Sequence, residues 1–474
     1  MEGTVLAKGC GKGQVCPPPP PKNNQGPHRR ASAGLSSTRP VAGVSLAKAL
    51  DAQRKSLQPT ETIVRLKDGR RFVEQTGRQL NNDGILPPGA VLEARRKEIL
   101  TRISSSDVLT SDRLIHTHDW MRWFLGTDEP TLIAQKHIFR DGMGDFINTM
   151  SGQRWPAGRF DCPSIALLQA GVGSPVGPSG ENRREADPCP LTVVDGIDIG
   201  TLQGDLTSEQ CAMVQVASNF NCLENSGSHV VADYGHLVEN YAFDSTQGPA
   251  ATFGTPAAAL LRCHYVFQDL DTPSSQWGQT VDRQVDLLTD VTDFTGHCVN
   301  GKLVLSGDEP PVSDLSIDDI ASRIRVGIHE DAHVVFRRGN LPDVLEVLPS
   351  PPKIDQVLSS SLNWRSLPIV SRAQRKSVRS LTRALLRASY EGAYLAAILR
   401  GRKLLLLTLV GGASFENPID LILEELQRAH SRWASHPKSD LQEVRLVLYE
   451  AGVASAIRNR LAGWGKIAAS NVDP

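Results

Sequence analysis

The hydrophobic pattern of residues 197–224 predicts two strands joined by a loop. Apolar and polar positions alternate from Ile197, Gly204-Asp205 interrupts the alternation, and Cys211 to Ala217 is apolar enough for a strand buried on both faces. Asp205 then lies in the loop and Asn219 follows the second strand. Because ligands of open α/β sheets bind beyond the carboxyl ends of strands, both side chains are expected beside a ligand.

The C-terminal half carries the strongest periodicity. Ser377 to Gly401 has the apolar spacing of a helix, and Gly401 supplies its stop. Lys403 to Val410 is almost wholly apolar, as expected for a buried strand, and a Gly-containing turn leads from it into a helix over Ile419 to His430. Glu443 to Tyr449 predicts a final strand.

Three further predictions fall between these regions. Arg262 to Phe267 is predicted to be a strand, and Gln279 to Leu288 an amphipathic helix with a solvated charged face. His329-Glu330-Asp331-Ala332-His333 matches the pattern HExxH, whose zinc chemistry needs both histidines on one face of a helix. The flanking residues alternate as strands do, so the motif is predicted to lie on a hairpin turn and to bind no metal.

The N-terminal third divides at about residue 60. Residues 1–60 are rich in Pro and Gly and poor in large apolar residues, so a disordered arm is expected. Within it, Pro17 to Pro21 could serve as an SH3 or WW ligand or as a plain linker. Residues 61–184 are predicted to be a mostly helical accessory region. Its segment from His116 to Asp119 contains ligand types without a spaced partner, and no metal site is expected there.

Composition narrows the function classes. A chain of 474 residues allows one large core with additions or two domains, and the formal net charge of −1 gives no general argument for nucleic acid or an anionic membrane surface. No apolar run approaches the roughly 20 residues that span a bilayer. The eight cysteines form no CxxC pair, which favours reduced thiols in a cytoplasmic or nuclear protein. A transit peptide stays open, because residues 1–55 carry basic and Ser residues and few acidic ones.

Two motifs at the start of the core resemble those of the macrodomain superfamily, whose members bind ADP-ribose. Gly204-Asp205-Leu206-Thr207 is followed by Val214 to Asn219, and Gln215-Val216 is similar to the poly(ADP-ribose) glycohydrolase branch. The resemblance implies that Asp205 accepts a hydrogen bond from the adenine amino group. It also implies that Asn219 lies near the distal ribose.

The turn after residue 410 is similar to the second phosphate-binding loop of the same superfamily. The resemblance implies that the backbone of Gly411 and Gly412 meets the diphosphate, that Phe415 packs near the proximal ribose and that Asn417 belongs to the same loop. It further implies that Tyr449 stacks on the adenine. A strand-to-helix turn without a ligand and a Tyr packed in the core are the alternatives.

The first phosphate loop departs from the superfamily pattern. Residues 246–251 contain Gln247 and Gly248 in the expected place but only one glycine, and the Glu-Glu pair of the glycohydrolases is missing. Ala413 and Glu416 also stand where superfamily members commonly have glycine. These departures leave the catalytic group open among Asn219, Gln247 and Glu416.

Together, these patterns predict an α/β fold, with a macrodomain-like mixed sheet sandwiched by helices over residues 185–455. An N-terminal helical layer and disordered arm precede it, and a tail follows over residues 456–474. Met213–Ala217 and Leu404–Val410 should be strands of one sheet whose carboxyl ends open into one cleft. The expected function is binding of ADP-ribose or of an ADP-ribosylated protein or nucleotide, with or without hydrolysis and without a cofactor. The alternative is a non-enzymatic interaction scaffold with a degenerate pocket.

Overall fold

The computed structural model describes two units of the chain, residues 1–92 and 93–474. In the first, three strands form an antiparallel sheet: β1 (Ile63–Arg65), β2 (Arg71–Val73) and β3 (Arg78–Leu80). In the second, the described residues are 113–131, 144–177, 189–224, 238–265, 278–449 with short gaps, and 451–461. The expected arm with Pro17 to Pro21 lies outside the described residues. None of the helices described has the length and apolar character needed to cross a membrane.

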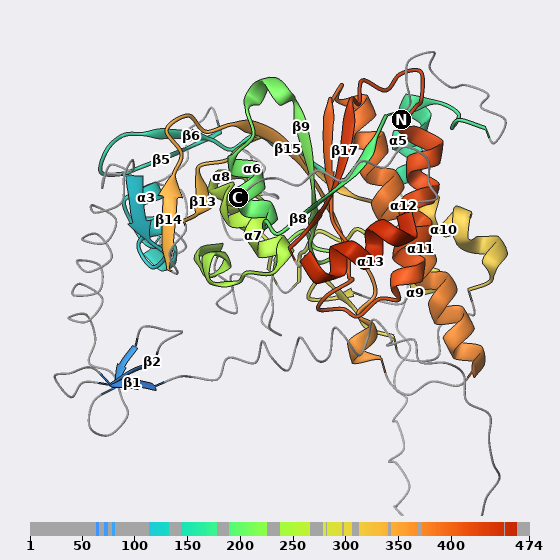
Figure 1. The fold of residues 1–474 in the computed structure, drawn as a ribbon, viewed down its shortest axis with the longest axis horizontal. Helices are drawn as coiled ribbons and strands as arrows, with labels where there is room; N and C mark the ends of the chain where they lie inside the picture. Colours follow the sequence, from blue (N-terminus) through green and yellow to red (C-terminus); the bar gives the residue numbers. More distant parts are fainter. Residues whose placement is uncertain are drawn as a thin grey trace, which may run out of the picture. The chain divides into compact units, whose positions relative to one another are not determined.

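A seven-stranded mixed sheet is the centre of the second unit (Figure 1), which confirms the predicted α/β class. In spatial order its strands are β7 (Arg159–Asp161), β12 (Gly327–His333), β15 (Lys353–Ser359), β9 (Ala212–Ala217), β16 (Leu404–Leu407), β17 (Glu443–Leu448) and β8 (Leu191–Asp195). The strands from β15 to β8 are parallel, whereas β12 is antiparallel to both of its neighbours. Parallel strands buried on both faces need the near-continuous apolar runs seen in β16.

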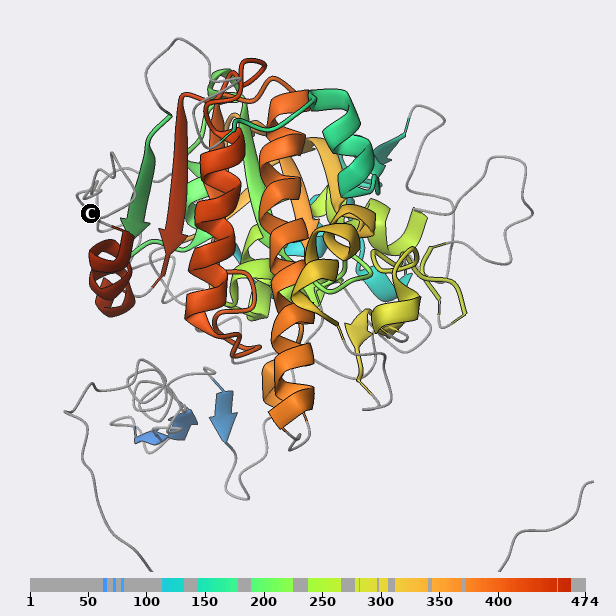
Figure 2. The ribbon, with the colours of Figure 1, turned by 90° about the vertical axis from the view of Figure 1, so that its right-hand side faces the viewer.

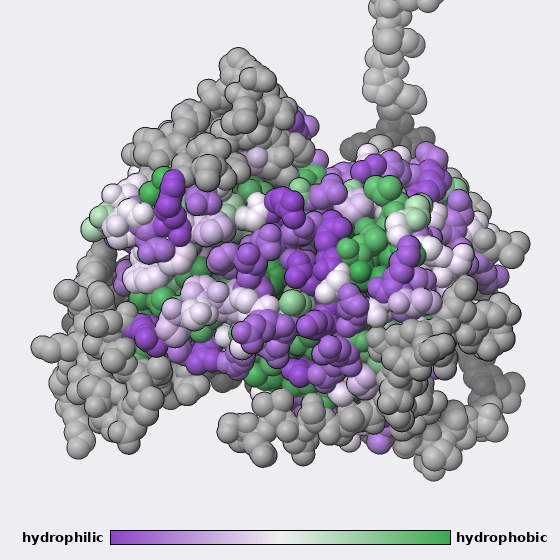
Figure 3. Space-filling model, turned by 90° about the horizontal axis from the view of Figure 1, so that it is seen from above, coloured by the Kyte–Doolittle hydropathy of each residue, from purple (hydrophilic) through white to green (hydrophobic). Residues whose placement is uncertain are grey.

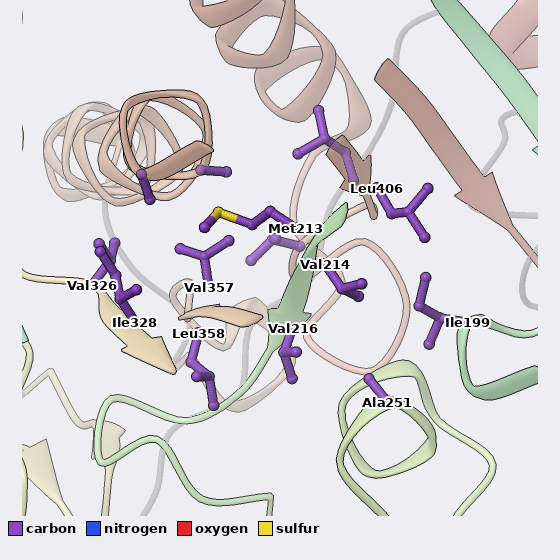
Figure 4. Close-up of a cluster of buried hydrophobic side chains, with 14 of the residues drawn as sticks. Ile199, Met213, Val214, Val216, Ala251, Val326, Ile328, Val357, Leu358 and Leu406 are labelled. Atoms are coloured by element: carbon purple, nitrogen blue, oxygen red, sulfur yellow. The ribbon is translucent and has the colours of Figure 1, made fainter. Parts of the chain in front are cut away.

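Helices cover both faces of this sheet. On one face, α11 (Arg372–Leu399) and α12 (Ile419–Trp433) run side by side (Figure 2). Packed around α11 are α5 (Ile165–Val172) and α10 (Ile317–Arg323). Alternate residues of β9 face opposite sides, because Gln215 hydrogen-bonds Ser389 of α11 whereas Val214 points towards Ile199 (Figure 4). The second face is therefore covered by α6 (Ile199–Gly204), α7 (Gln247–Phe253) and α8 (Pro256–Leu260).

The two long helices are joined by a buried ion pair. Arg387 of α11 donates from Nε and Nη2 to the two carboxylate oxygens of Glu425 of α12, at 2.8 and 3.0 Å. A bidentate pair fixes the rotation of both helices as well as their separation. The predicted helices and strands over 377–401, 403–410, 419–430 and 443–449 are confirmed, with bounds shifted by a few residues.

The predicted accessory region contributes strands as well as helices. Besides β1, β2 and β3, its described part comprises β4 (Leu114–His116), α3 (Trp120–Leu125), β5 (Asp145–Ile147), β6 (Arg154–Pro156), β7 and α5. β7 is an edge strand of the central sheet, and β4 pairs with the hairpin of β13 (Phe336–Arg338) and β14 (Val344–Val347). Strands thus accompany the expected helices in the described part of this region, because pairing to distant strands overrides some of the local helical spacing.

Three local predictions are wrong. Ile199–Gly204 is the helix α6, because Asp198 caps it by accepting from the Thr201 N–H at 2.9 Å. Leu261–Tyr265 is a π-helical turn instead of a strand, and the described residues of 279–288 form turns instead of a helix. The remaining elements are α9 (Thr292–Thr295), α13 (Ala451–Leu461) and the hairpin of β10 (Cys298–Val299) and β11 (Lys302–Leu303).

The HExxH motif lies within β12. The predicted strand conformation is confirmed, but the hairpin turn is not: a bulge between His329 and Ala332, with Asp331 at φ 58°, interrupts the strand. A strand places the two histidines differently from a helix, so the motif lacks the zinc-binding geometry of metalloproteases. Among the coloured residues on the face shown in Figure 3, hydrophilic residues predominate, and groups of hydrophobic residues lie between them.

Candidate functional site

The connections of the parallel strands predict where a ligand binds at the carboxyl edge of the sheet. From the end of β9 the chain continues to α7 on one face, and from the end of the neighbouring strand β16 it continues to α12 on the other. Where adjacent parallel strands lead to opposite faces, their loops diverge and leave a crevice that binds ligands. The pairing of β9 with β16 confirms the prediction that the two are parallel strands of one sheet, with their carboxyl ends at the same edge. We call the region between them the switch-point crevice.

Gly411 determines the shape of the loop that follows β16. Its φ of 70° is left-handed, and a Cβ there would lie 2.0 Å from Ser361 Oγ and 2.3 Å from Asn417 Nδ2. Asn417 Nδ2 donates to Ser361 Oγ, Leu362 O and Gly411 O at 3.1, 2.8 and 3.1 Å. Asn417 therefore joins the loops after β15 and β16, a structural role that leaves its Oδ1 for other partners.

Three buried oxygens of these two loops make no hydrogen bond to any described residue. They are Ser360 Oγ, Asn363 Oδ1 and Asn417 Oδ1. Buried polar atoms are nearly always paired with protein, water or ligand, so their clustering in adjacent loops at a sheet edge indicates a site for a polar molecule. One hydroxyl and two amide carbonyls can together accept from, and donate to, the hydroxyls of a sugar.

Gln247 completes the edge of β9. Its Oε1 accepts from the Ala217 N–H at 2.8 Å, and its Nε2 donates to Gln215 O at 2.9 Å. β16 pairs with β9 only as far as Val214, and beyond this residue the Gln247 side chain supplies the backbone hydrogen bonds instead. Gly248 follows it so closely that a Cβ would lie 2.2 Å from Ala217 O. Both residues stand at the crevice, but the Gln247 amide holds the strand end and is not placed to activate water.

Asn219 closes a tight turn directly after β9. Its backbone N–H and its Nδ2 both donate to Leu223 O, at 3.1 and 3.0 Å, and its own carbonyl accepts from Cys222. The side chain is 4 % exposed. Asn219 therefore lies at the predicted edge, where it shapes the turn that leads to Glu224.

Asp205 does not lie at this edge, contrary to the prediction. It follows α6, which runs from the carboxyl end of β8 towards the amino end of β9, and it pairs with Arg337 of β13. Ser208, three residues later, bonds the first residue of β15 and thereby marks the amino edge. The carboxylate that does follow a strand end is Asp198, after β8.

Asp198 and Tyr449 follow the carboxyl ends of the neighbouring strands β8 and β17. β8 and β17 are parallel partners, and the N–H of Gly196 donates to the carbonyl of Leu448 at 3.1 Å. Asp198 and Tyr449 also lie near Arg338. Burial lowers the pKa of Arg338, whereas the charges of Asp198 and Tyr449 raise it. Tyr449 is 71 % exposed, so it is not a core residue, and its ring is accessible to a planar group.

The remaining predicted residues lie in the loop after β16. Gly412 and Phe415 are half-buried, and the Phe415 carbonyl accepts from Trp364 at 2.9 Å. Glu416 is exposed, with a left-handed φ of 55°. Glycine adopts such a φ without strain, whereas Glu416 adopts it at a steric cost.

A buried charged cluster lies below the crevice. Glu224 is 5 % exposed, its backbone N–H bonds Tyr241 Oη at 3.0 Å, and its Oε2 would lie 2.2 Å from a Cβ on Gly248. Burial raises the pKa of Glu224 to about 8, although the nearby Arg262 opposes this. Arg262 is 1 % exposed, and its Nε and Nη2 have no partner among the described residues. A carboxyl group and a guanidinium thus share a pocket without bonding each other.

His329 fixes the other side of Arg262. Its Nε2 lies 2.6 Å from Ala157 O and its Nδ1 3.2 Å from Arg262 Nη1. Because a carbonyl only accepts and a guanidinium only donates, the imidazole carries its proton on Nε2 and is neutral. Burial and, to a smaller extent, the charge of Arg262 lower the pKa of His329 to about 3.

Sequence reasoning missed Asp198, Glu224 and Arg262. Asp198 had a local signal, because Asp is a preferred residue at the start of a helix, but the alternation around Ile197 obscured it. Glu224 and Arg262 had none, since they are brought together by the fold and not by spacing. No disulfide joins any of the six described cysteines.

No known family model matches the chain, and no curated protein matches it. Among solved structures, the chain is similar to poly(ADP-ribose) glycohydrolase from Deinococcus radiodurans in its apo form, with 12 % identity, 64 % of this chain and 93 % of that chain covered, and a TM-score of 0.33. The complex of that protein with ADP-ribose gives 10 % identity, coverages of 64 % and 94 %, and a TM-score of 0.34. The glycohydrolase from Thermomonospora curvata gives 14 % identity, coverages of 66 % and 93 %, and a TM-score of 0.33. These structures belong to the branch that the sequence motifs resemble.

Proposed function

We propose that this protein binds ADP-ribose, or a protein or nucleotide that carries it, along the carboxyl edge of its sheet. The observation that carries the proposal is that the chain leaves the neighbouring strands β9 and β16 towards opposite faces of the sheet. The loops beside this point bear Gly411 and three buried oxygens without a hydrogen-bond partner among the described residues. Topology alone predicts a ligand there, and the chemistry of the loops selects one with hydroxyl groups and phosphates.

The two ends of the crevice differ in chemistry. Near β9 and β16, the turn over residues 413–415 brings backbone amides to an exposed part of the loop, where a diphosphate would accept from them. Near β17 and β8, Tyr449 offers a ring for stacking and Asp198 a carboxylate that accepts from an exocyclic amino group. From β9 to β8 are three strand spacings, roughly 14 Å, a length that suits a dinucleotide-sized ligand rather than a lone phosphate.

Asp198→Asn tests the adenine end of this site. Asn caps helices as well as Asp does, so α6 should remain folded, but the charge is lost. Exchanging a charged for a neutral hydrogen bond should weaken ADP-ribose binding by about 1 kcal/mol, or roughly fivefold. Isothermal titration of the full chain with ADP-ribose, with NAD and ATP alongside, measures this.

Asp205→Asn is the matched control, because it removes the same charge at the other end of α6, where Asp205 pairs with Arg337. Its affinity for ADP-ribose should equal that of the wild type. A larger loss in Asp205→Asn than in Asp198→Asn would restore Asp205 as the adenine contact. If wild-type protein binds none of the three nucleotides, the proposal fails and the interaction-scaffold alternative stands.

A second candidate function, hydrolysis of the ADP-ribosyl linkage, is favoured by Glu224. Its carboxyl lies next to Gly248 at the end of β9, and its raised pKa keeps it protonated near neutral pH. A protonated carboxyl can donate a proton to a departing group, as general acids do. Of the three groups suggested by the sequence, Asn219 and Gln247 are occupied with backbone bonds.

Glu224→Gln should therefore abolish hydrolysis of an ADP-ribosylated protein while ADP-ribose still binds. General acid catalysis contributes on the order of 100- to 10,000-fold, so release of ADP-ribose should fall at least 100-fold. In the wild type, the rate should decline as the pH rises through about 8, because the carboxyl then loses its proton. Glu416→Gln is the comparison: a loss of hydrolysis there, with Glu224→Gln active, would assign catalysis to the exposed loop.

A further inference from the structure

Glu129, Cys263 and His264 form a fully buried cluster that the proposed nucleotide site does not use. Their side-chain oxygen, sulfur and nitrogen atoms all lie within 4.8 Å of one another, and the residues are 0, 0 and 1 % exposed. Across the described ranges, this is the one group of three or more His, Cys, Asp or Glu residues found so close together. Buried polar groups of three different kinds in one place require a common partner or mutual pairing.

The backbone holds Cys263 and His264 in an uncommon conformation. Both lie in the π-helical turn Leu261–Tyr265, a wider turn than an α-helix that occurs often at functional sites. Gln279 fixes the turn from outside: its N–H donates to Cys263 O at 2.9 Å and its Nε2 to Arg262 O at 3.0 Å. Gly278, at φ 75°, allows this approach, since a Cβ there would lie 2.6 Å from His264 Cα. The two side chains are thus presented by a rigid support.

Glu129 is oriented by a hydrogen bond of its own. The Glu239 N–H donates to Glu129 Oε2 at 2.7 Å, which directs the other oxygen, Oε1, to His264 Nε2 at 2.6 Å. Outer hydrogen bonds of this kind orient the ligating carboxylates of metal sites.

We propose that Glu129, Cys263 and His264 bind one Zn²⁺ ion. Thiolate, imidazole and carboxylate are the three ligand types that zinc accepts, whereas Mg²⁺ and Ca²⁺ prefer oxygen alone. Binding displaces the thiol proton and the proton between His264 and Glu129 to solvent. A fourth position remains for a water molecule.

The distances between the ligand atoms of the cluster are close to those between the ligands of a coordinated zinc ion. Nitrogen and oxygen ligands at about 2.0–2.1 Å in a tetrahedron lie roughly 3.3 Å apart. The 2.6 Å contact of His264 with Glu129 therefore has to open by roughly 0.7 Å, whereas the widest separation of up to 4.8 Å has to close. Side-chain rotations suffice for both changes.

Zinc at this cluster would connect parts of the chain that are far apart in sequence. Glu129 lies 135 positions before His264, beyond the range of any short metal-binding motif. The ion would hold the segment after α3 against the π-helical turn, as a crosslink does, and would stabilise the folded state by its binding free energy.

The test is titration of the purified full chain with Zn²⁺ alone and with Co²⁺ as a spectroscopic substitute. After chelator treatment, wild-type protein should take up one Zn²⁺ per chain in competition with a chromophoric chelator. Co²⁺ should give the absorption of a thiolate-bound ion. Zinc should also protect Cys263 from a thiol reagent, with the protected residue identified by mass spectrometry. This last measurement uses wild-type protein and does not depend on the folding of a variant.

Cys263→Ser should lose the cobalt–thiolate absorption and bind zinc at least 10-fold more weakly, because altering even outer-shell partners costs about 10- to 100-fold. Cys189→Ser, at another buried cysteine, should keep the cobalt–thiolate absorption and the zinc affinity of the wild type. Failure of the wild type to bind stoichiometric zinc would overturn the site, as would protection of a different cysteine or equal binding by Cys263→Ser. A nucleotide-binding defect would leave these results unchanged, so the two proposals are tested separately.

Discussion

The free energy of unfolding should fall steeply as the pH decreases from 6.5, and His329→Gln should remove a large part of that dependence. Burial holds the pKa of His329 at about 3 in the folded protein, whereas an unfolded histidine has its ordinary value of 6.5. Between these values the unfolded chain binds a proton that the folded chain does not. Stability conferred by the neutral imidazole is therefore present above pH 6.5 and is lost as the pH falls, by about 1.4 kcal/mol per pH unit.

Two other buried groups contribute to the same pH profile. Burial lowers the pKa of His430 to about 4, which adds a loss of stability of the same sign below pH 6.5. Glu224 acts in the opposite direction, because its pKa is raised from 4.5 to about 8 and stability falls as the pH rises through this window. The wild-type profile alone is a sum, so the difference between wild type and variant is the informative quantity.

Urea unfolding of wild type and His329→Gln at several pH values measures this difference. From pH 6.5 to 4.5, the stability advantage of the wild type should shrink by about 2 kcal/mol, and above pH 7 it should be nearly constant. His118→Gln, at an exposed residue, controls for the loss of an imidazole as such. A difference that does not vary between pH 4.5 and 6.5 would show that His329 is charged in the folded protein, against the hydrogen bonds to Ala157 and Arg262.

Gly411→Ala should destabilise the protein by about 2–5 kcal/mol and abolish ADP-ribose binding. A left-handed residue with a Cβ costs roughly 1–2 kcal/mol. Overlap of the new Cβ with Ser361 Oγ, at 2.0 Å, and Asn417 Nδ2, at 2.3 Å, adds an overpacking cost of about 1–3 kcal/mol. Relief of that overlap would separate the loops after β15 and β16, which flank the switch-point crevice.

Gly152→Ala separates the cost of a left-handed backbone from the cost of the steric overlap. Gly152 has a φ of 71°, almost the same as Gly411, but a Cβ there meets no atom within 4 Å. Its replacement should lower the free energy of unfolding only by the roughly 1–2 kcal/mol that a Cβ costs at a left-handed residue, and it should leave the ADP-ribose affinity unchanged. Equal destabilisation of the two variants, measured by urea unfolding, would mean that the loops after β15 and β16 adapt freely. Undiminished binding by Gly411→Ala would place the ligand elsewhere.

The hydrophobic pattern of the sequence was enough to predict the helices and strands that are buried along their whole length. The 28-residue helix α11, with Leu381, Leu385 and Ala388 on its buried side, and the all-leucine strand β16 were predictable because periodicity reports burial directly. The order of β9, β16 and β17 in one parallel sheet then placed Asn219, Gly411 and Tyr449 at one edge. Where propensity and context conflict, as in the π-helical turn that was predicted as a strand, the sequence was insufficient.

Tertiary structure alone decided which polar residues meet. Asp198 and Asp205 are seven positions apart, yet the helix between them carries one to the carboxyl edge of the sheet and the other towards the amino edge. Glu224 and Arg262, and likewise Glu129 and His264, are brought together by packing, with no spacing that marks them. The physical reason is that hydrophobic periodicity encodes which side of an element faces the core, whereas the pairing of buried charges depends on how distant elements are stacked.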